Sequence, residues 1–337
     1  MAINDGSASA PSTIKVGDRA AWLEALETER PVLVHLNADT TWLIQLPYPA
    51  SCTPPPGRRR FNVVLDPWLK GPQTDVAAWF STQWHVVEPS VQTLDQLNSI
   101  LAGLEQGGGG PRVTNSSYID AVAVSHEFTD HCHQPTLTQL PPSTPVFAPD
   151  KAARLIRSWK HFASVAITPR FSSTTESWRT GLSAAGLPPW VGIGRVVTDG
   201  DPMHFHSAIV IAFDAGEAEA VLYSPHGVRA SDLACVRGYG LSTLALLHGL
   251  HEVRIRMIQQ LNLGAMNGIK AVGQTGARYW IATHDEPKKG TGLIAPMLQR
   301  TRYTLEEAAD AEESRTKCRI PEYDFVDLGS GDGVVLR

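Results

Sequence analysis

The chain has 337 residues, a formal net charge of −5, 42% hydrophobic residues and 19% charged residues. This length allows a sizeable core, and the composition is that of an ordinary globular protein. A slightly acidic chain without a basic stripe argues against nucleic acid as a partner, and no stretch reaches the ~18 to 20 apolar residues of a membrane span. The four cysteines are scattered, and no basic and apolar secretory signal opens the chain. Both features favour a cytoplasmic protein with reduced thiols.

The first third of the chain predicts a short helix and three strands. Residues 1–15 are small and polar and are predicted to be disordered, which leaves residues 16–337 as a single domain. A helix is expected over 18–29 and strands over 32–36, 41–46 and 61–65. The third strand ends at Asp66, whose carboxylate can accept the spare N–H of a metal-bound imidazole and fix its tautomer. A plain turn Asp before Pro67 is the alternative.

Residues 71–85 are aromatic and partly apolar. They are interpreted either as a lid or wall over a pocket or as part of the core, where tryptophans more often lie. A helix is predicted over 94–104. The four glycines at 107–110 indicate a flexible loop and not a phosphate-binding loop, because no Lys-Ser/Thr helix start follows them.

The most informative stretch is Ala121–Leu137, in which four small apolar residues run directly into a polar cluster. The apolar run predicts a short buried strand, and its end delivers His126, Asp130, His131 and His133 onto a loop. Imidazole and carboxylate together suit zinc or iron better than calcium or magnesium. A His-rich surface loop is the alternative, but the tight spacing favours a metal site.

The rest of the chain alternates strands and helices, which predicts α/β layers. A helix is expected to begin at 134, with strands over 145–148 and 164–167 around a helix over 151–161. His204 and His206 precede a strand over 208–213, the strand over 221–224 ends near His226, and the strand over 279–283 ends at His284. Asp285 either orients His284 or is solvated, solvation is favoured for Glu286, and residues 288–290 are expected to form a turn. A short helix is expected over 269–272, and an acidic helix over 304–314.

The segment Ser-His-Glu-Phe-Thr-Asp-His at 125–131 resembles the His-x-His-x-Asp-His motif of the metallo-β-lactamase fold superfamily. His126 matches the first His, Asp130 the Asp and His131 the last His, but Phe128 stands where the second His is expected. The run from His35 to His85 is similar to a divergent, mostly uncharacterised eukaryotic branch that carries Asp-Pro-Trp-Leu and Trp-Phe-Ser-like elements.

The resemblance implies an αββα sandwich over roughly residues 32–295, with metal ligands drawn from several loops. The ligands that it implies are His126, Asp130, His131, one of His204 and His206, and the late His284. The sequence leaves the choice between His204 and His206 open. His133 can compensate for the missing His but lies outside the motif.

A second departure from the superfamily occurs at His226. Most relatives carry a metal-bridging Asp where this chain has Pro225-His226-Gly227, and a neutral imidazole does not bridge two cations as a carboxylate does. Together with Phe128, this predicts one ion in place of two, zinc first, with iron or manganese as alternatives. His226 is then a terminal ligand or an acid/base.

The function expected from these features is hydrolysis of a small organic ester, lactone or thioester-like metabolite by metal-activated water. Asp130 would ligate the metal or take the proton from the water. The alternatives are a phosphodiesterase on lipid-like substrates, a lyase or isomerase that stabilises an enolate, and a binding protein that has lost catalysis. Phe128 and His226 are the features that favour the last of these.

Overall fold

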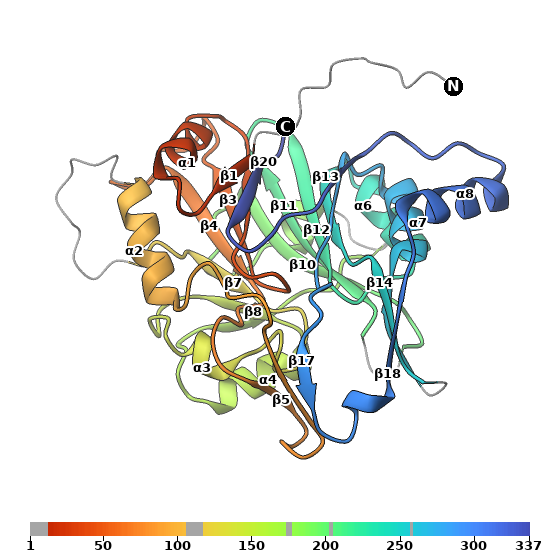
Figure 1. Ribbon diagram of the computed structural model, residues 1–337. Helices are drawn as coiled ribbons and strands as arrows, with labels where there is room; N and C mark the ends of the chain where they lie inside the picture. The colour runs from red at the N-terminus through yellow and green to blue at the C-terminus, as the bar shows by residue number, and fades with distance from the viewer. Residues whose placement is uncertain (1–12, 106–116, 173–176, 202–204, 257–258) are drawn as a thin grey trace.

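The computed structural model describes residues 13–105, 117–172, 177–201, 205–256 and 259–337 (Figure 1). Residues 1–12, most of the segment predicted to be disordered, lie outside this part. Thr13–Lys15 form strand β1, which pairs with the C-terminal strand β20, so the predicted disorder does not extend through residue 15.

Eight strands form the first of two central sheets. Their spatial order is β1-β20-β2-β3-β4-β7-β8-β9. The strands are β1 (Thr13–Lys15), β20 (Asp332–Val335), β2 (Val32–His35), β3 (Trp42–Pro47), β4 (Arg60–Leu65), β7 (Ala121–Ala123), β8 (Val146–Ala148) and β9 (Val165–Ile167). The pairings from β1 to β4 are antiparallel, and those from β4 to β9 are parallel. Six strands of this sheet were predicted from the sequence, and all six are present. They are β2, β3, β4, β7, β8 and β9.

Six strands form the second central sheet, in the order β10-β11-β12-β13-β16-β19. They are β10 (Val191–Val197), β11 (Ser207–Asp214), β12 (Ala218–Ser224), β13 (Ser242–His248), β16 (Tyr279–Ile281) and β19 (Asp324–Val326). The pairs β10–β11 and β11–β12 are antiparallel, whereas β12, β13, β16 and β19 run parallel to one another.

The two sheets pack face to face, and alternate side chains of each strand enter this interface. Along β11, Ile209 and Ile211 join buried residues of the first sheet such as Ile44 and Val63, whereas Val210 belongs to the cluster on the outer face. Burial on both faces explains why the strands read as nearly continuous apolar runs.

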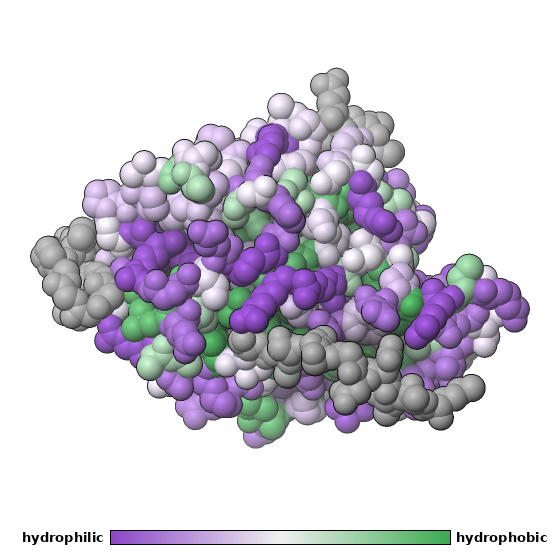
Figure 2. Space-filling model, turned by 90° about the horizontal axis from the view of Figure 1, so that it is seen from above, coloured by the Kyte–Doolittle hydropathy of each residue, from purple (hydrophilic) through white to green (hydrophobic). Residues whose placement is uncertain are grey.

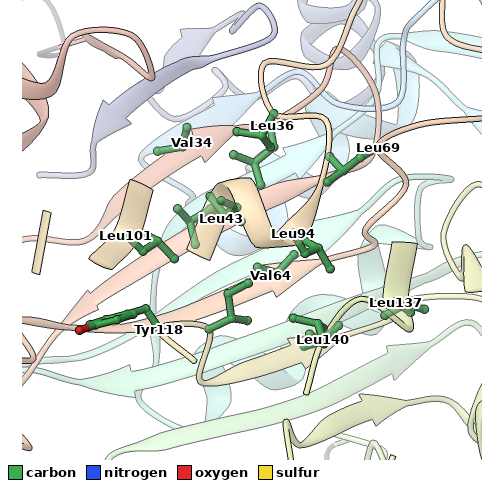
Figure 3. Packing of buried hydrophobic residues seen from close by; sticks show 14 of the residues in the cluster. Val34, Leu36, Leu43, Val64, Leu69, Leu94, Leu101, Tyr118, Leu137 and Leu140 are labelled. Atoms are coloured by element: carbon green, nitrogen blue, oxygen red, sulfur yellow. The ribbon is translucent and has the colours of Figure 1, made fainter. Parts of the chain in front are cut away.

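Helices cover both outer faces, which confirms the predicted αββα arrangement. The first sheet is covered by α1 (Arg19–Leu26), α2 (Leu94–Glu105), α3 (Gln134–Leu137) and α4 (Asp150–Ser158). Leu94 and Leu101 of α2 are seven residues apart and therefore lie on the same face of the helix. Both point toward Val64 and Leu43 of the strands below (Figure 3). Each such buried leucine contributes about 1.5–3 kcal/mol.

The second sheet is covered by α5 (Trp178–Gly181), the 3₁₀ helix η1 (Ala230–Leu233), α6 (Ala234–Gly238), α7 (Ala265–Thr275) and α8 (Leu305–Thr316). The predicted acidic helix is α8, and its first turn carries a capping box between Thr304 and Glu307. In Figure 1, α1 and α2 lie on one side of the paired sheets, with α6, α7 and α8 on the other. The face seen in Figure 2 is mainly hydrophilic, as the burial of apolar residues in three internal clusters requires.

Two small sheets extend from this core. One joins β14 (His251–Ile255), β15 (Gln259–Leu263) and β18 (Leu298–Arg302), and the 3₁₀ helix η2 (Ala295–Met297) precedes β18. The other joins β5 (Gln73–Asp75), β6 (Ser81–Trp84) and β17 (Lys289–Thr291) and projects from the bottom of the molecule in Figure 1. No helix of the described residues combines the length and apolar character that crossing a bilayer requires.

Candidate metal centre

The polar cluster forms where strands of both central sheets end. The strands β4 and β7 are parallel neighbours, so Asp66 and the loop after Ala123 leave the same edge of the first sheet. In the second sheet, β12, β13 and β16 are parallel, so His226 and His284 leave the corresponding edge. Face-to-face packing of the sheets then brings the two edges together.

Three imidazole rings at this edge form a nearly equilateral triangle. The ring centroids of His131, His226 and His284 are 4.9, 5.0 and 5.1 Å apart, in the pairs His131–His226, His226–His284 and His131–His284. The Nε2 atoms of His131 and His226 are 2.9 Å apart. The carboxylate of Asp130 closes the group, with Oδ1 3.6 Å from Nε2 of His131 and Oδ2 3.8 Å from Nε2 of His284. We call Asp130, His131, His226 and His284 the histidine cluster.

Each ring of the triangle uses its Nδ1 atom for a hydrogen bond to a protein oxygen. Nδ1 of His131 donates to Asp66 Oδ2 at 2.6 Å, which confirms the expected use of Asp66 as a partner of a histidine. Nδ1 of His226 donates to Asn262 Oδ1 at 3.0 Å, and Nδ1 of His284 donates to Asp39 Oδ1 at 3.0 Å. These bonds place a ring proton on Nδ1 of each histidine, so that Nε2 is the atom free to bind a metal when the ring is neutral, as metal-binding imidazoles require.

Burial keeps two of these rings neutral. Burial, and then the imidazole of His131, holds the pKa of His226 well below its ordinary value. Burial also lowers the pKa of His284, in spite of the Asp39 carboxylate. Burial alone would lower the pKa of His131 too, but Asp130 and Asp66 outweigh it and raise that pKa. The raised pKa of His131 shows that the two carboxylates favour a positive charge in the cluster, while the rings of His226 and His284 stay neutral.

A buried lysine, Lys288, completes the charge pattern. Its Nζ lies 2.7 Å from Asp39 Oδ2 and 3.1 Å from Asp130 Oδ2. Burial would lower the pKa of Lys288, but the two carboxylates outweigh it and raise the pKa. Burial would raise the pKa of Asp130, but His131 and Lys288 hold it well below its ordinary value. Lys288 is therefore an ammonium and Asp130 a carboxylate.

His126 lies beside the cluster but has its ring nitrogens engaged. One ring nitrogen of His126 lies within 4.8 Å of a ring nitrogen of His131 and of His226. However, its Nε2 is 2.9 Å from the carbonyl oxygen of Phe205, which can only accept, so Nε2 carries the proton. Its Nδ1 contacts the Ser125 hydroxyl at 2.8 Å.

Phe128 forms an aromatic wall on this side of the cluster. Its ring stacks on Phe205, with centroids 4.9 Å apart and planes at 9°, and it lies 6.0 Å from the ring of His126. The residue that replaces the second motif histidine thus closes the space next to His126 with apolar surface.

The structure does not bring the other two candidate histidines of the described residues into the cluster. His206 faces Asp201, with Nδ1 3.2 Å from Oδ2, and His133 precedes α3 with Nδ1 2.8 Å from the Thr136 hydroxyl. Burial lowers the pKa of His133 to about 4. His204, the alternative to His206, lies outside the described residues.

Three contributors to the site were not identified from the sequence, namely Asp39, Asn262 and Lys288. The turn expected over residues 288–290 is wrong, because Lys289 and Gly290 belong to strand β17, and the side chain of Lys288 is buried between two carboxylates. The solvated position expected for Glu286 is also wrong. Glu286 is 3% exposed and accepts hydrogen bonds from His85 Nδ1 and from the backbone N–H groups of Val86 and Val87. Asp39 follows a buried strand as Asp66 does, and that pattern could have identified it.

The aromatic stretch at 71–85 forms most of the projecting β5–β6–β17 sheet. Its base contacts the metal-motif loop, because the Thr129 hydroxyl accepts from the N–H of Thr74 at 2.9 Å. Its tip carries Val76 and Trp79, which are 85% and 70% exposed. Trp79 is therefore not a core residue, and the segment stands next to the histidine cluster as a lid or wall would.

Two residues of the site also have a strained backbone. Asp66 and His284, which are not glycines, adopt the left-handed region with φ values of 40° and 58°. Such residues cost of order 1–3 kcal/mol each and persist where the surrounding structure holds them. Here the hydrogen bonds of Asp66 to Ser125 and His131, and of His284 to Asp39, hold both residues.

A separate surface cavity of about 580 Å³ lies near β1 and β20, lined by residues such as Lys15, Ser90 and Asp332. None of its lining residues belongs to the histidine cluster or contacts it. The convergent buried polar groups, and not this cavity, therefore identify the candidate site.

Comparison with solved structures reveals the same fold in several proteins. A possible metal-dependent hydrolase from Veillonella parvula covers 91% of this chain and 100% of its own, with a TM-score of 0.55 and 15% identity. An isothiocyanate hydrolase from Delia radicum gut bacteria covers 90% and 99%, with a TM-score of 0.53 and 12% identity. CmlA, a diiron β-hydroxylase from Streptomyces venezuelae, covers 92% and 55%, with a TM-score of 0.51 and 12% identity.

No family model and no curated protein matches the sequence. At these identities the structural likenesses establish the fold and not the activity. The element order, the paired sheets and the near-complete coverage agree with the resemblance carried by residues 125–131, although the likeness to one eukaryotic branch stays a prediction. The chain has the αββα fold of the metallo-β-lactamase superfamily.

Proposed function

We propose that the chain is a metal-dependent hydrolase that binds one ion at Asp130, His131, His226 and His284. One observation carries this proposal: three buried imidazoles donate through Nδ1 to Asp66, Asn262 and Asp39, and His131 joins two groups of converging ligand atoms. The ligand atoms of Asp130, His131 and His284 lie within 4.8 Å of one another, as do those of His126, His131 and His226. A core histidine packed for stability has no need of this shared orientation, whereas a metal ligand does.

The donor set fits a transition metal. Three imidazole nitrogens and one carboxylate oxygen suit zinc, and they also suit iron or manganese, whereas calcium and magnesium prefer oxygen ligands. The neutral state that burial favours for His226 and His284 suits the same role, because a protonated imidazole cannot ligate. Zinc is the ion that we propose first.

Such an ion, when bound, lowers the pKa of a water molecule and polarises a carbonyl or phosphoryl oxygen. The chain's own residues hold and orient the site. Asp66 and Asp39 fix the ring orientations of His131 and His284. Phe128 and Phe205 exclude water from the side next to His126. The low pKa of Asp130 makes it a poor proton acceptor. Of its two candidate roles, we therefore assign it metal ligation and not proton transfer.

We propose a small organic ester, lactone or thioester-like molecule as the substrate class. Two proteins with this fold are described as hydrolases, one of them of isothiocyanates, and they are similar over nine-tenths of the chain. The β5–β6–β17 sheet contacts the motif loop at its base and carries the exposed Val76 and Trp79 at its tip, which offers apolar surface to such a molecule. The net charge of −5 supports a partner other than nucleic acid. The cytoplasmic location stays a prediction.

The test combines metal analysis with a hydrolysis screen. Protein purified without added metal should contain about one transition-metal ion per chain and hydrolyse at least one member of a panel of esters, lactones and thioesters. His131→Ala should lose both properties, whereas the matched variant His133→Ala should keep them. Metal-free protein that takes up no ion under any loading condition would contradict the proposal. Full metal content with no turnover on the panel would instead support a binding protein, the alternative that Phe128 and His226 favour.

A further inference from the structure

The feature that distinguishes this cluster is the buried cation at Lys288. Its ammonium lies between the carboxylates of Asp39 and Asp130, at 2.7 and 3.1 Å, and its side chain is only 9% exposed. A buried lysine in an enzyme-like site has a cost in desolvation, which is offset only when carboxylates surround it, as they do here. The ammonium is thus a fixed element of the site.

The two carboxylate oxygens of Asp130 have different partners because of the position of Lys288. Oδ2 is within hydrogen-bonding distance of the ammonium, whereas Oδ1 faces Nε2 of His131 at 3.6 Å. The same holds for Asp39, because Oδ1 accepts from His284 and Oδ2 contacts Lys288. A metal ion binds carboxylate oxygens at about 2.0–2.2 Å, so it cannot share the space between Asp39 and Asp130 with the ammonium.

The charges point to the same conclusion. Among the described residues, the carboxylates that contact rings of the cluster are Asp39, Asp66 and Asp130. Three negative charges are balanced by the Lys288 ammonium and one divalent ion. A second divalent ion would leave two uncompensated positive charges in a buried site, which is strongly unfavourable.

We propose that Lys288 takes the place of a second cation and limits the centre to one ion. This inference rests on the proposed metal-dependent function and deepens it by assigning the cause of the single ion. Lys288 acts as a positioning residue: it balances Asp39 and Asp130 and keeps Oδ1 of Asp130 directed at the ion site. Phe128 closes the histidine side of the centre, and Lys288 closes the carboxylate side.

The experiment measures zinc binding, not turnover, in four proteins. These are the natural sequence, Lys288→Met, the charge-retaining Lys288→Arg and Lys289→Met, which removes the neighbouring exposed lysine of β17. Metal-free protein is titrated with zinc ions against a chromogenic chelator, the stoichiometry is checked by native mass spectrometry, and circular dichroism confirms folding. We expect one equivalent in the natural protein, in Lys288→Arg and in Lys289→Met.

Lys288→Met should bind a second equivalent, because the positive charge between Asp39 and Asp130 is removed. A folded Lys288→Met that still binds one equivalent would overturn the inference while leaving the proposed function intact. Two equivalents in the natural protein would overturn it as well, and this measurement does not depend on any variant folding. No bound zinc in the natural protein would overturn the proposed function, and the role of Lys288 with it.

Discussion

The two sides of the candidate centre differ in chemical character, one being polar and charged and the other mainly aromatic. On the polar side, which comprises Asp130, His131 and His284, ring nitrogens are bonded to the carboxylates of Asp66 and Asp39. On the aromatic side, which comprises His126, Phe128 and Phe205, the one imidazole is bonded to a backbone carbonyl and faces stacked phenyl rings. Both sides lie on loops that follow buried strands, and both are largely buried.

The difference indicates what a metal site needs beyond histidines. On the polar side every imidazole has a charged acceptor that sets its tautomer, so its other nitrogen is available. On the aromatic side the available nitrogen is taken by Phe205, and no carboxylate lies in contact among the described residues. His226 stands between the two sides, with an uncharged partner in Asn262. The number of convergent nitrogens alone therefore overestimates the number of metal ions.

The largest effect should follow from removing a ring of the polar side. His131→Ala and His284→Ala are each expected to lower zinc affinity by more than about 100-fold, since the loss of an outer hydrogen-bond partner alone costs about 10–100-fold. His133→Ala should leave the affinity within about threefold, because its ring contacts Thr136 and not the cluster. Chelator competition on the three variants measures this. If His133→Ala removes the metal while His284→Ala retains it, the assignment of the polar side is wrong.

A smaller effect should follow from neutralising the acceptor of a ring. Asp66→Asn is expected to lower zinc affinity about 10–100-fold, because the amide accepts more weakly from Nδ1 of His131 and can present an N–H to it instead. Asp201→Asn is the matched control, since Asp201 pairs with His206 away from the cluster. Equal affinities for both variants would show that the carboxylate partners do not distinguish the two sides.

The aromatic side can be tested by giving it a ligand. Phe128→His is expected to cost about 1–3 kcal/mol of apolar burial. Because Lys288 still limits the natural centre to one ion, the substitution is made in the Lys288→Met protein, where it is expected to raise the bound zinc above that of Lys288→Met alone. Release of His126 from the Phe205 carbonyl would cost roughly a further 1 kcal/mol. Elemental analysis and thermal unfolding measure the two effects. Unchanged stoichiometry in a folded variant would mean that Phe128 does not set the metal count.

The smallest effect concerns His251, which lies outside both sides and provides a reference for pH-dependent stability. Burial, and then Arg300 and Arg302, lower the pKa of His251 to about 4 from 6.5. The unfolded chain therefore binds a proton between pH 6.5 and 4 that the folded chain does not, and the stability present above pH 6.5 is lost as the pH falls.

His251→Gln should remove this part of the pH dependence, while the exposed-site variant Lys289→Met should not. Urea unfolding of metal-free protein at pH 7 and pH 5 measures it. An identical pH dependence in His251→Gln and the natural protein would exclude His251 as its source.

Much of the fold could be predicted because both faces of the central strands are buried. Runs such as Val32–Val34 and Ala208–Phe213 are apolar throughout, so they can be recognised without knowledge of the partner strand. The edge strand β10 was not predicted, because Gly192 and Gly194 weaken its pattern. The structure explains both glycines, since a Cβ at these positions would lie 2.7 and 2.3 Å from Leu182 atoms.

The site was predictable only where one local segment carries it. His126, Asp130 and His131 follow a single strand within six residues, and His226 and His284 each follow a recognisable strand end. Lys288 and Asn262 gave no comparable signal, because what defines them is a buried partner from a distant segment. Lys288 meets Asp39 from the opposite end of the chain, and only the packed sheets bring the two together.

The position of β20 has a consequence for the order in which the molecule assembles. Val335 pairs with Val32 and Val334 with Thr13, so the last strand inserts between two of the first. During synthesis, one edge of β2 lacks its partner until residues 332–335 emerge. Pairings of such high sequence separation form slowly and leave an open strand edge available to other chains. We therefore expect nascent chains that lack β20 to depend on chaperones, and the finished sheet to gain its protection from aggregation in a single late step.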